Sequence, residues 1–365
     1  MAQIKIKNLR KDFGTFNAVK SSTFTIEDGE FFMLLGPSGC GKTTTLRMIA
    51  GLELPSSGSI FLGGEDVAFK RASERDIAFV FQLFALYPHM NVRKNIGFPL
   101  LCQGVGPAEI KLRVEETAKL LRIDHILDKS VSGLAGGDRQ RVALGRAIVR
   151  RPLAFLMDEP LGTLDTEFRD LMCEELRHLH DRIKATTVYV THDQLEAMSM
   201  ADYIAIMNRG VIEQLGTPQS IYDRPATMYV AEFVGSPAMN LIHVQGQLAK
   251  GAKSIEISGT RIAIPETREA ALNGSFILGA RPEHIRFDDK SKFRGEIFGT
   301  EYLGTTQIVT VDIGQGRLKA RVPANVTVKV GEQVGLTFMG EKLSVFNKAS
   351  GHAIKTALHE GLAHG

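Results

Sequence analysis

The sequence predicts two domains, a layered α/β domain followed by a β-rich domain. Up to about residue 235, short apolar runs alternate with helical patterns, which is typical of buried parallel strands joined by helices. A glycine-rich loop, GPSGCGKTT at 36–44, lies between the first apolar run and a helical pattern. After VGSPAMN at 234–240 the pattern changes to short segments with a period of two, separated by glycine turns. The 365 residues also favour two domains, since one domain commonly holds about 150 residues.

The first domain, 1–235, is predicted to contain a parallel sheet. Its strands are the apolar runs at 31–35, 77–81, 153–157, 187–190 and 203–207. Between the third and fourth runs, apolar side chains recur every three to four residues and predict one amphipathic helix through Phe168, Met172, Leu176, Leu179 and Ile183.

The second domain, 236–365, is predicted to be a small β-barrel or a pair of barrels. Alternating apolar side chains mark two of its strands, at 318–322 and 334–338, and a GQG turn at 314–316 precedes the first. The tail from Lys348 has no clear pattern and is expected to fray.

Composition limits the possible functions. Hydrophobic residues make up 44% and charged residues 23%, the balance of a folded soluble protein, and the net charge of +3 gives no reason to expect a nucleic-acid partner. The three cysteines are widely spaced, so neither a disulfide framework nor a zinc site is indicated. The N-terminal segment lacks the apolar core of a signal peptide, and the longest apolar runs are far too short to span a membrane. Any membrane role is therefore expected to be peripheral.

The loop at 36–44 fits the phosphate-binding pattern G-x-x-x-x-G-K-[ST]. Its backbone N–H groups and the following helix N-terminus favour an anion, so we expect Lys42 to reach the β- and γ-phosphates and Thr43 to bind Mg²⁺. A glycine-rich turn without a ligand is the alternative, which the strand before and the helix after disfavour. The expected nucleotide-binding residues here are Gly36, Pro37, Ser38, Gly39, Cys40, Gly41, Lys42, Thr43 and Thr44.

Two carboxylates follow the apolar run LAFLM, at the end of a strand where parallel sheets place ligand-binding groups. Asp158 is the expected Mg²⁺ carboxylate, and Glu159 is expected to polarise the water that attacks the γ-phosphate. Alone, the pair could equally be a surface turn before Pro160. The phosphate-binding loop in the same chain favours the catalytic interpretation.

Five motifs in order make the sequence resemble the ATP-binding subunits of ABC transporters, specifically importers of the carbohydrate-uptake class (maltose or glycerol-phosphate type). They are GPSGCGKTT, VFQ ending at Gln82, LAGGDRQRVALGRA, FLMDEP and VTHD. The similarity extends to FALYPHMNVRKNI and, in the second domain, to LGARPEHI and EYLG. It implies an ABC-type P-loop NTPase fold, an OB-like (TOBE-type) C-terminal domain that regulates and dimerises, and ATP with Mg²⁺ as ligands.

The resemblance also assigns residues outside the phosphate-binding loop. Phe13 is similar to the aromatic residue that stacks on adenine, with Val19 nearby. Gln82 is similar to the residue that senses Mg²⁺ and water, and His192 to the switch histidine that holds the γ-phosphate, the attacking water and Glu159 in register. Asp165 is similar to the carboxylate that couples the two sites of a dimer.

A second glycine-rich turn, LAGGD at 134–138, is explained only by the resemblance. In the family two ATPase subunits face head to tail, and this turn closes over the γ-phosphate bound by the partner subunit. The turn's expected nucleotide contacts are Ala135, Gly136, Gly137 and Asp138. A homodimer is favoured and a heterodimer is possible.

The same resemblance implies partners and a location. Residues 83–106 resemble the groove that receives a helix from one of two transmembrane permease subunits, which take solute from an external binding protein. The expected location is peripheral, at the cytoplasmic face of the cell membrane. Sugars, polyols and glycerol phosphodiesters all fit as solutes.

The sequence departs from the usual LSGGQ signature at two positions. Ala135 lacks the serine hydroxyl, whose hydrogen bond to a charged group is worth about 1.5–3 kcal/mol. Asp138 brings a carboxylate towards phosphate, at a cost of about 2 kcal/mol for an assumed ~8 Å and a dielectric constant of about 20. Gly162 stands where serine is usual in the turn before Asp165. We therefore predict slowed but real ATP hydrolysis.

Two other functions remain alternatives. One is a soluble ABC ATPase of DNA repair or translation, which the single cassette and the near-neutral charge disfavour. The other is a nucleotide-dependent regulatory module with negligible turnover.

Overall fold

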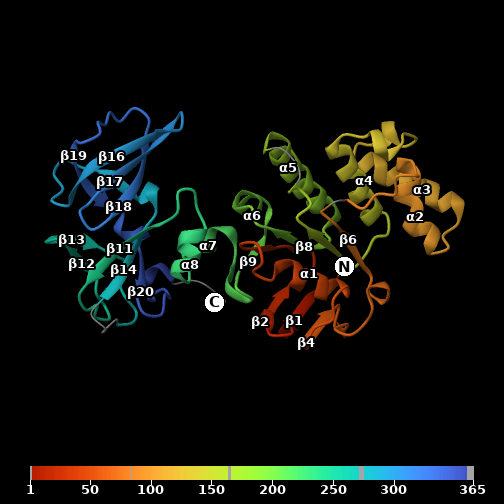
Figure 1. Ribbon diagram of the computed structural model, residues 1–365, viewed down its shortest axis with the longest axis horizontal. Helices are drawn as coiled ribbons and strands as arrows, with labels where there is room; N and C mark the ends of the chain where they lie inside the picture. The colour runs from red at the N-terminus through yellow and green to blue at the C-terminus, as the bar shows by residue number, and fades with distance from the viewer. Residues whose placement is uncertain (1, 83, 163–165, 271–274, 360–365) are drawn as a thin grey trace. The chain divides into compact units, whose positions relative to one another are not determined.

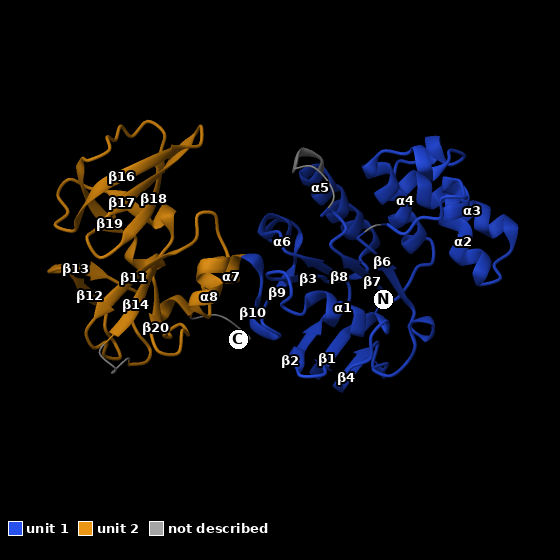
Figure 2. Ribbon diagram, viewed as in Figure 1, with its two compact units in different colours: residues 1–218 blue, residues 219–365 orange. Residues whose placement is uncertain are grey.

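The polypeptide divides into two units after Pro218, as Figure 2 shows. The computed structural model describes residues 2–82, 84–162, 166–270 and 275–359. The sequence analysis places the boundary at 235/236, where the residue pattern changes. The intervening segment holds two short helices, α7 (Pro218–Asp223) and α8 (Met228–Phe233), whose packing is not visible in that pattern.

A six-stranded sheet forms the centre of the first unit (Figure 1). Its order is β10-β9-β3-β8-β7-β6, and all neighbours are parallel except the edge pair β9 and β10. The predicted apolar runs form its five parallel strands, so the α/β prediction is confirmed. These strands are β3 (Phe31–Leu35), β6 (Ile77–Val80), β7 (Ala154–Asp158), β8 (Thr186–Thr191) and β9 (Tyr203–Asn208), and the edge strand is β10 (Val211–Gly216).

A second, antiparallel sheet of order β2-β1-β4-β5 shares one hydrophobic core with this parallel sheet. Its strands are β1 (Ile4–Phe13), β2 (Phe16–Ile26), β4 (Ser57–Leu62) and β5 (Glu65–Asp66). Figure 1 shows α1 (Lys42–Ala50) between the two sheets. A separate group of helices comprises α2 (Val92–Cys102), α3 (Pro107–Leu120) and α4 (Gly136–Ile148), and these three pack on one another.

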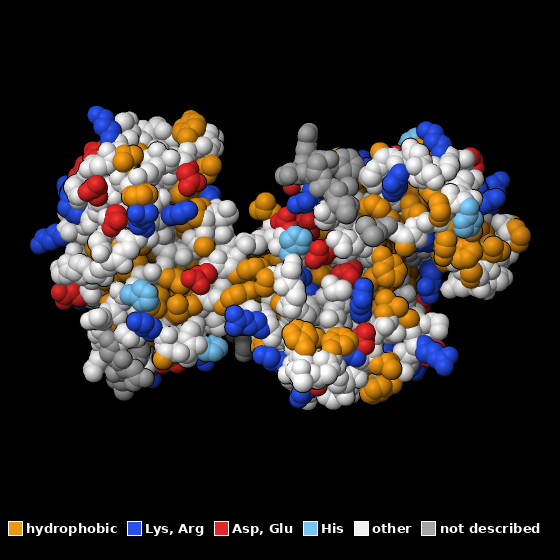
Figure 3. All heavy atoms as spheres, viewed as in Figure 1, with side chains coloured by type: hydrophobic (Ala, Val, Ile, Leu, Met, Phe, Trp, Pro, Cys, Tyr) orange, Lys and Arg blue, Asp and Glu red, His pale blue; other side chains and the backbone are white. Residues whose placement is uncertain are grey.

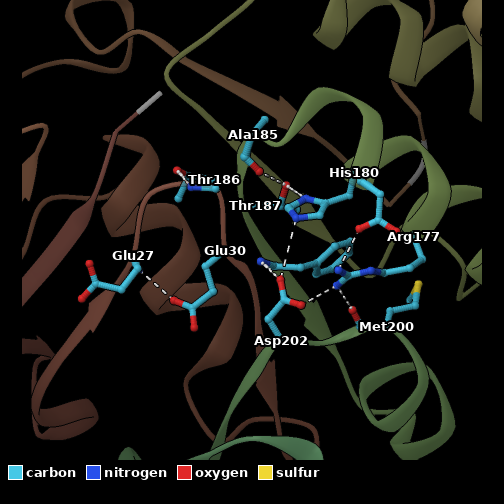
Figure 4. A network of polar contacts seen from close by, with 12 residues as sticks. Glu27, Glu30, Arg177, His180, Ala185, Thr186, Thr187, Met200 and Asp202 are labelled. Atoms are coloured by element: carbon cyan, nitrogen blue, oxygen red, sulfur yellow. Dashed lines mark hydrogen bonds and ion pairs between the residues drawn. The ribbon is translucent and has the colours of Figure 1, made fainter.

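The amphipathic helix predicted between the third and fourth strands is α5 (Thr166–Ile183). Figure 4 shows how polar contacts hold its C-terminal end. Arg177 donates to the Asp202 carboxylate at 2.8 Å, and the same carboxylate accepts the Phe31 N–H at 2.8 Å. The His180 Nδ1 lies 3.2 Å from the Thr187 hydroxyl, and burial lowers the pKa of His180. These contacts join α5 to β3, β8 and the start of β9, which fixes the strands that carry the site.

The described residues of the second unit form three antiparallel sheets, as the period-two segments predict, which pack around a main hydrophobic core and a smaller one beside α8. Its five-stranded sheet has the order β15-β19-β16-β17-β18, in which β18 and β19 contain the two segments that the sequence singled out. The strands of this sheet are β15 (Ile285–Phe287), β16 (Arg294–Tyr302), β17 (Thr306–Asp312), β18 (Arg317–Pro323) and β19 (Gln333–Phe338). The others are β11 (Asn240–Gln245), β12 (Ser254–Ile257), β13 (Thr260–Ala263), β14 (Ser275–Ala280) and β20 (Ser344–Asn347).

Arg281 attaches α7 and α8 to this unit. Its buried guanidinium lies 4.1 Å from the Tyr222 ring and donates to the carbonyls of Tyr222, Ala231 and Val234. The prediction of a frayed tail is wrong for residues 348–359. The Ile354 side chain is buried in the core, and the N–H groups of Ala353 and Ile354 donate to the carbonyls of Ala226 and Val345, which attaches this segment to the unit.

The surface carries no broad field of one charge on the face that Figure 3 shows, where acidic and basic side chains are interspersed over each unit. Among the described residues, no helix is both long enough and apolar enough to cross a membrane.

Candidate active site

Glycine is required in the loop between β3 and α1 because other backbone approaches it closely. A Cβ on Gly36 would lie 2.2 Å from the Met207 carbonyl oxygen, and one on Gly41 would lie 2.5 Å from the Ala18 carbonyl oxygen. Gly39 and Gly41 also have φ values of 77° and 108°, which side chains rarely adopt. Residues 37–39 are exposed at the tip and Cys40 is buried below them, so the loop presents its backbone to solvent. This is the form of a phosphate cradle at a helix N-terminus.

Lys42 is the first residue of α1 and is only 4% exposed. Its ammonium group donates to the carbonyls of Gly36 at 2.8 Å and Pro37 at 2.9 Å. No carboxylate of the described residues forms an ion pair with it. A buried ammonium group whose described partners are two loop carbonyls and the Cys40 sulfur has no counter-ion among them, which favours an anionic ligand such as a triphosphate.

Thr43 and Asp158 meet beneath this loop. The Thr43 hydroxyl donates to Asp158 Oδ1 at 3.0 Å, and burial raises the pKa of the Asp158 carboxyl. One hydroxyl and one carboxylate suit Mg²⁺, which usually takes few protein ligands and completes its shell with water and substrate phosphates. Within the described residues no group of three or more His, Cys, Asp or Glu side chains could hold a metal ion alone. The pair therefore fits a metal that arrives with a phosphate ligand.

Glu159 and His192 come together at the ends of β7 and β8. Glu159 Oε2 lies 3.2 Å from His192 Nδ1, and the histidine side chain is 55% exposed against 21% for the glutamate. Glu159 has a φ of 45°, and its N–H donates to the Val190 carbonyl at 3.0 Å. A non-glycine residue in this conformation is uncommon and turns Glu159 away from the strand direction of Asp158. The arrangement suits a carboxylate that accepts a proton beside a histidine that orients it.

Gln82 follows β6 and is exposed beside Gly162. A Cβ on Gly162 would lie 3.6 Å from the Gln82 amide nitrogen and 3.8 Å from Glu159 Oε2, so both side chains approach one point. Gly162 has ordinary van der Waals space for a side chain, and sterics do not require glycine there. Asp165, the predicted coupling carboxylate, lies outside the described residues.

The glycine-pair turn forms the start of α4. Ala135 is the N-cap residue and has no side-chain hydrogen bond to the helix, because alanine offers no acceptor. Ala135 and Gly136 are exposed, and Gly137 is buried. In the described part of the chain no hydrogen bond or ion pair joins residues 134–138 to the phosphate-binding loop. The chain thus presents two separate anion-favouring turns, each at a helix N-terminus.

Phe13 ends β1 and is 48% exposed, as a stacking residue must be. The Lys11 ammonium lies 4.7 Å from the centre of its ring and is anchored by the Leu54 carbonyl at 2.8 Å and Glu53 at 2.6 Å. Val19 is fully buried, with a methyl 3.4 Å from the Cβ position of Gly41, so it supports the phosphate loop from below.

Sequence reasoning did not single out Lys11. Its position two residues before Phe13 on one strand, and therefore on the same face, is the signal that could have found it.

Four neighbouring strands thus bring a phosphate cradle, a Thr–Asp pair, a Glu–His pair and a glutamine to one edge of a parallel sheet. These features and the fold define a P-loop ATPase. A model of the ABC transporter family matches residues 19–162, the MalK OB fold domain matches 235–285 and the TOBE domain matches 278–346.

Two relatives match nearly the whole chain. The trehalose/maltose import ATP-binding protein MalK of Thermococcus litoralis is 42% identical, and the alignment covers 97% of this chain and 100% of the relative. The sn-glycerol-3-phosphate import ATP-binding protein UgpC 2 of Agrobacterium fabrum is 43% identical, with 98% and 95% covered. The chain belongs to the ATP-binding subunits of ABC importers of the carbohydrate-uptake class, and the resemblance drawn from the motifs is confirmed.

A solved structure agrees with the assignment of the first unit. It is cbiO1 from Clostridium perfringens, described as part of the ABC transporter complex cbiONQ. This structure has a TM-score of 0.56 and 26% identity, and covers 60% of this chain and 89% of that one.

Proposed function

We propose that this chain is the ATPase subunit that energises import of a sugar or related solute, such as a polyol or a glycerol phosphodiester, across the cytoplasmic membrane. One observation carries the proposal: the Glu159–His192 pair, at 3.2 Å, lies at the same sheet edge as Lys42 and the Thr43–Asp158 pair. Relatives whose names describe sugar and glycerol-phosphate import support the solute class.

Each residue of the site has its own role in the proposed hydrolysis of ATP. The loop N–H groups and Lys42 bind the β- and γ-phosphates, and Phe13 stacks on the adenine. Thr43 and Asp158 would hold Mg²⁺, with Gln82 as the residue that senses it, and the ion would supply positive charge against the charge that develops on the phosphates. Glu159 accepts the proton of the attacking water, and His192 holds Glu159 and the γ-phosphate in register.

The turn at 135–138, exposed at Ala135 and Gly136, completes the site of a second ATPase subunit. Its N–H groups and the α4 N-terminus face the γ-phosphate bound by the partner, so ATP joins the two subunits and hydrolysis releases them. We favour a homodimer that acts on two transmembrane permease subunits, which in turn receive solute from an external binding protein. The chain then lies peripherally at the cytoplasmic face.

Hydrolysis tests the proposal first. The purified chain with Mg²⁺ and ATP should release phosphate, and Glu159→Gln should stop turnover while it leaves ATP binding intact. Equal activity of the two proteins would refute the catalytic assignment. Undetectable turnover by the unaltered chain, even with its membrane partners, would favour a regulatory module.

Co-purification tests which partners the chain binds. The tagged chain, isolated from detergent-solubilised membranes, should bring two membrane-spanning subunits with it. Recovery of soluble DNA-repair or translation components instead would favour the soluble ABC ATPase. A second, different ATPase subunit in the complex would replace the homodimer by a heterodimer.

A further inference from the structure

Arg141 connects the acidic residue of the glycine-pair turn to α5. Its Nη1 lies 3.5 Å from Asp138 Oδ1, one helical turn earlier on α4. Its other edge forms a forked contact with Glu175 of α5, with Nε at 3.1 Å from Oε2 and Nη2 at 2.9 Å from both carboxylate oxygens. One guanidinium therefore contacts two carboxylates, one on each of two helices.

We propose that Arg141 is a positioning residue that neutralises Asp138 and thereby lets this acidic turn close over ATP. The proposal rests on the proposed function, because it takes the turn to face the γ-phosphate of the partner subunit. Without a nearby cation, the Asp138 carboxylate would repel that phosphate. The guanidinium places a positive charge beside it at the same end of the helix.

The geometry favours neutralisation over an incidental surface contact. The side chains of Asp138, Arg141 and Glu175 are 29%, 19% and 28% exposed, so solvent screens their charges less than it screens a fully exposed pair. The fork with Glu175 fixes the guanidinium plane, and a long side chain in a helix leans towards the N-terminus. The charge is therefore held beside the first turn of α4.

The Glu175 contact also ties the turn to the catalytic sheet. α4 packs on α2, on α3 and on the edge strand β6, whereas α5 connects β7 with β8, the strands that lead to Glu159 and His192. The Arg141–Glu175 contact adds a side-chain link between α4 and α5. A purely structural role for Arg141 would depend on this tie and not on the charge at position 138, and this difference makes the two roles separable.

The test is a mutant cycle on ATP hydrolysis by the complete transporter, with KM for ATP as the main readout. Arg141→Gln should raise KM about tenfold in the natural chain, the effect of leaving one carboxylate uncompensated near phosphate. The same substitution in an Asp138→Gln background should change KM by less than about threefold. Arg141→Lys keeps the positive charge, so its KM for ATP should lie close to that of the natural chain.

Two controls accompany this test, the addition of salt and a substitution of Glu175. Added NaCl should narrow the difference in KM between the Arg141→Gln protein and the natural chain, because salt screens part of the repulsion at this partly exposed site. Glu175→Gln removes the tie to α5 and leaves the Asp138 contact, so it should raise KM less than Arg141→Gln does.

An equal rise in KM in both backgrounds, or an effect of Glu175→Gln as large as that of Arg141→Gln, would overturn the proposal and leave a structural role. If Arg141→Gln does not fold, Arg141→Met, which also removes the charge and keeps an unbranched side chain, takes its place in the same comparison of the two backgrounds. Failure of the proposed function is distinguishable, because the unaltered transporter would then hydrolyse no ATP in a Glu159-dependent manner.

Discussion

Replacement of Ala135 by serine should improve both the stability of the first unit and the affinity for ATP. Ala135 is the exposed N-cap residue of α4 and has no capping hydrogen bond. A serine oxygen there would accept a backbone N–H of the first turn, which is worth about 1 kcal/mol and about 2–4 °C in melting temperature for a unit of this size. The hydroxyl proton remains free for the γ-phosphate. A hydrogen bond to a charged group contributes about 1.5–3 kcal/mol, so KM for ATP should fall about ten- to a hundredfold.

The assay separates these two effects. Thermal unfolding of the free chain without nucleotide reports the cap, and steady-state phosphate release by the transporter reports KM. Ala135→Gly is the matched control, because glycine also suits an N-cap but has no hydroxyl to donate. A serine variant that gains stability while its KM equals that of the glycine variant would refute the γ-phosphate contact. A variant that gains neither would refute the assignment of residue 135 as an open cap.

Three further predictions concern other residues. Glu159→Gln should lower kcat by about 10²–10⁴-fold, measured by phosphate release, while filter binding of ATP persists. Lys11→Met, which removes the cation beside the aromatic ring, should weaken ATP about two- to fivefold and leave binding of inorganic tripolyphosphate unchanged, as competition assays can show. At pH 8 a thiol reagent should label Cys102, which is exposed, and spare the other two cysteines. Burial raises the pKa of Cys40 and raises that of Cys173 to about 12, so rapid labelling of either would contradict the structure.

Periodicity predicted the five parallel strands and helix α5 of the first unit and two strands of the second, because each of these elements buries a face of its own. The run Phe31–Leu35 is buried at every position and became the central strand β3, and α5 covers the helical pattern predicted around Met172 and Leu176. The tail could not be predicted in this way. Ile354 is buried through isolated contacts with distant residues, which leave no period in the local sequence.

The same distinction between local patterns and distant contacts applies to the residues of the site. Motifs predicted the residues that end strands or begin helices, since the carboxyl ends of β3, β6, β7 and β8 lie at one edge of the sheet. Contacts between side chains of different elements could not be predicted, because the sequence alone does not show which elements pack together. Arg141, which lies between carboxylates on two helices, is of this kind, whereas Lys11 and Phe13 lie on one strand and their spacing could have indicated the contact.

The Arg141 contact bears on the two departures in the glycine-pair turn. Taken from sequence, Ala135 is the departure that puts closure on ATP in doubt, and Asp138 is the milder one. In the structure Asp138 has a partly buried guanidinium at 3.5 Å, which it shares with Glu175, so part of its repulsion is offset within the same subunit. Ala135 has no such compensation, because nothing replaces a hydroxyl that both accepts from the helix and donates to phosphate. The slowed hydrolysis that we predict should therefore be traced to residue 135, and a transporter with serine there and aspartate retained at 138 should work nearly as well as one with both residues restored.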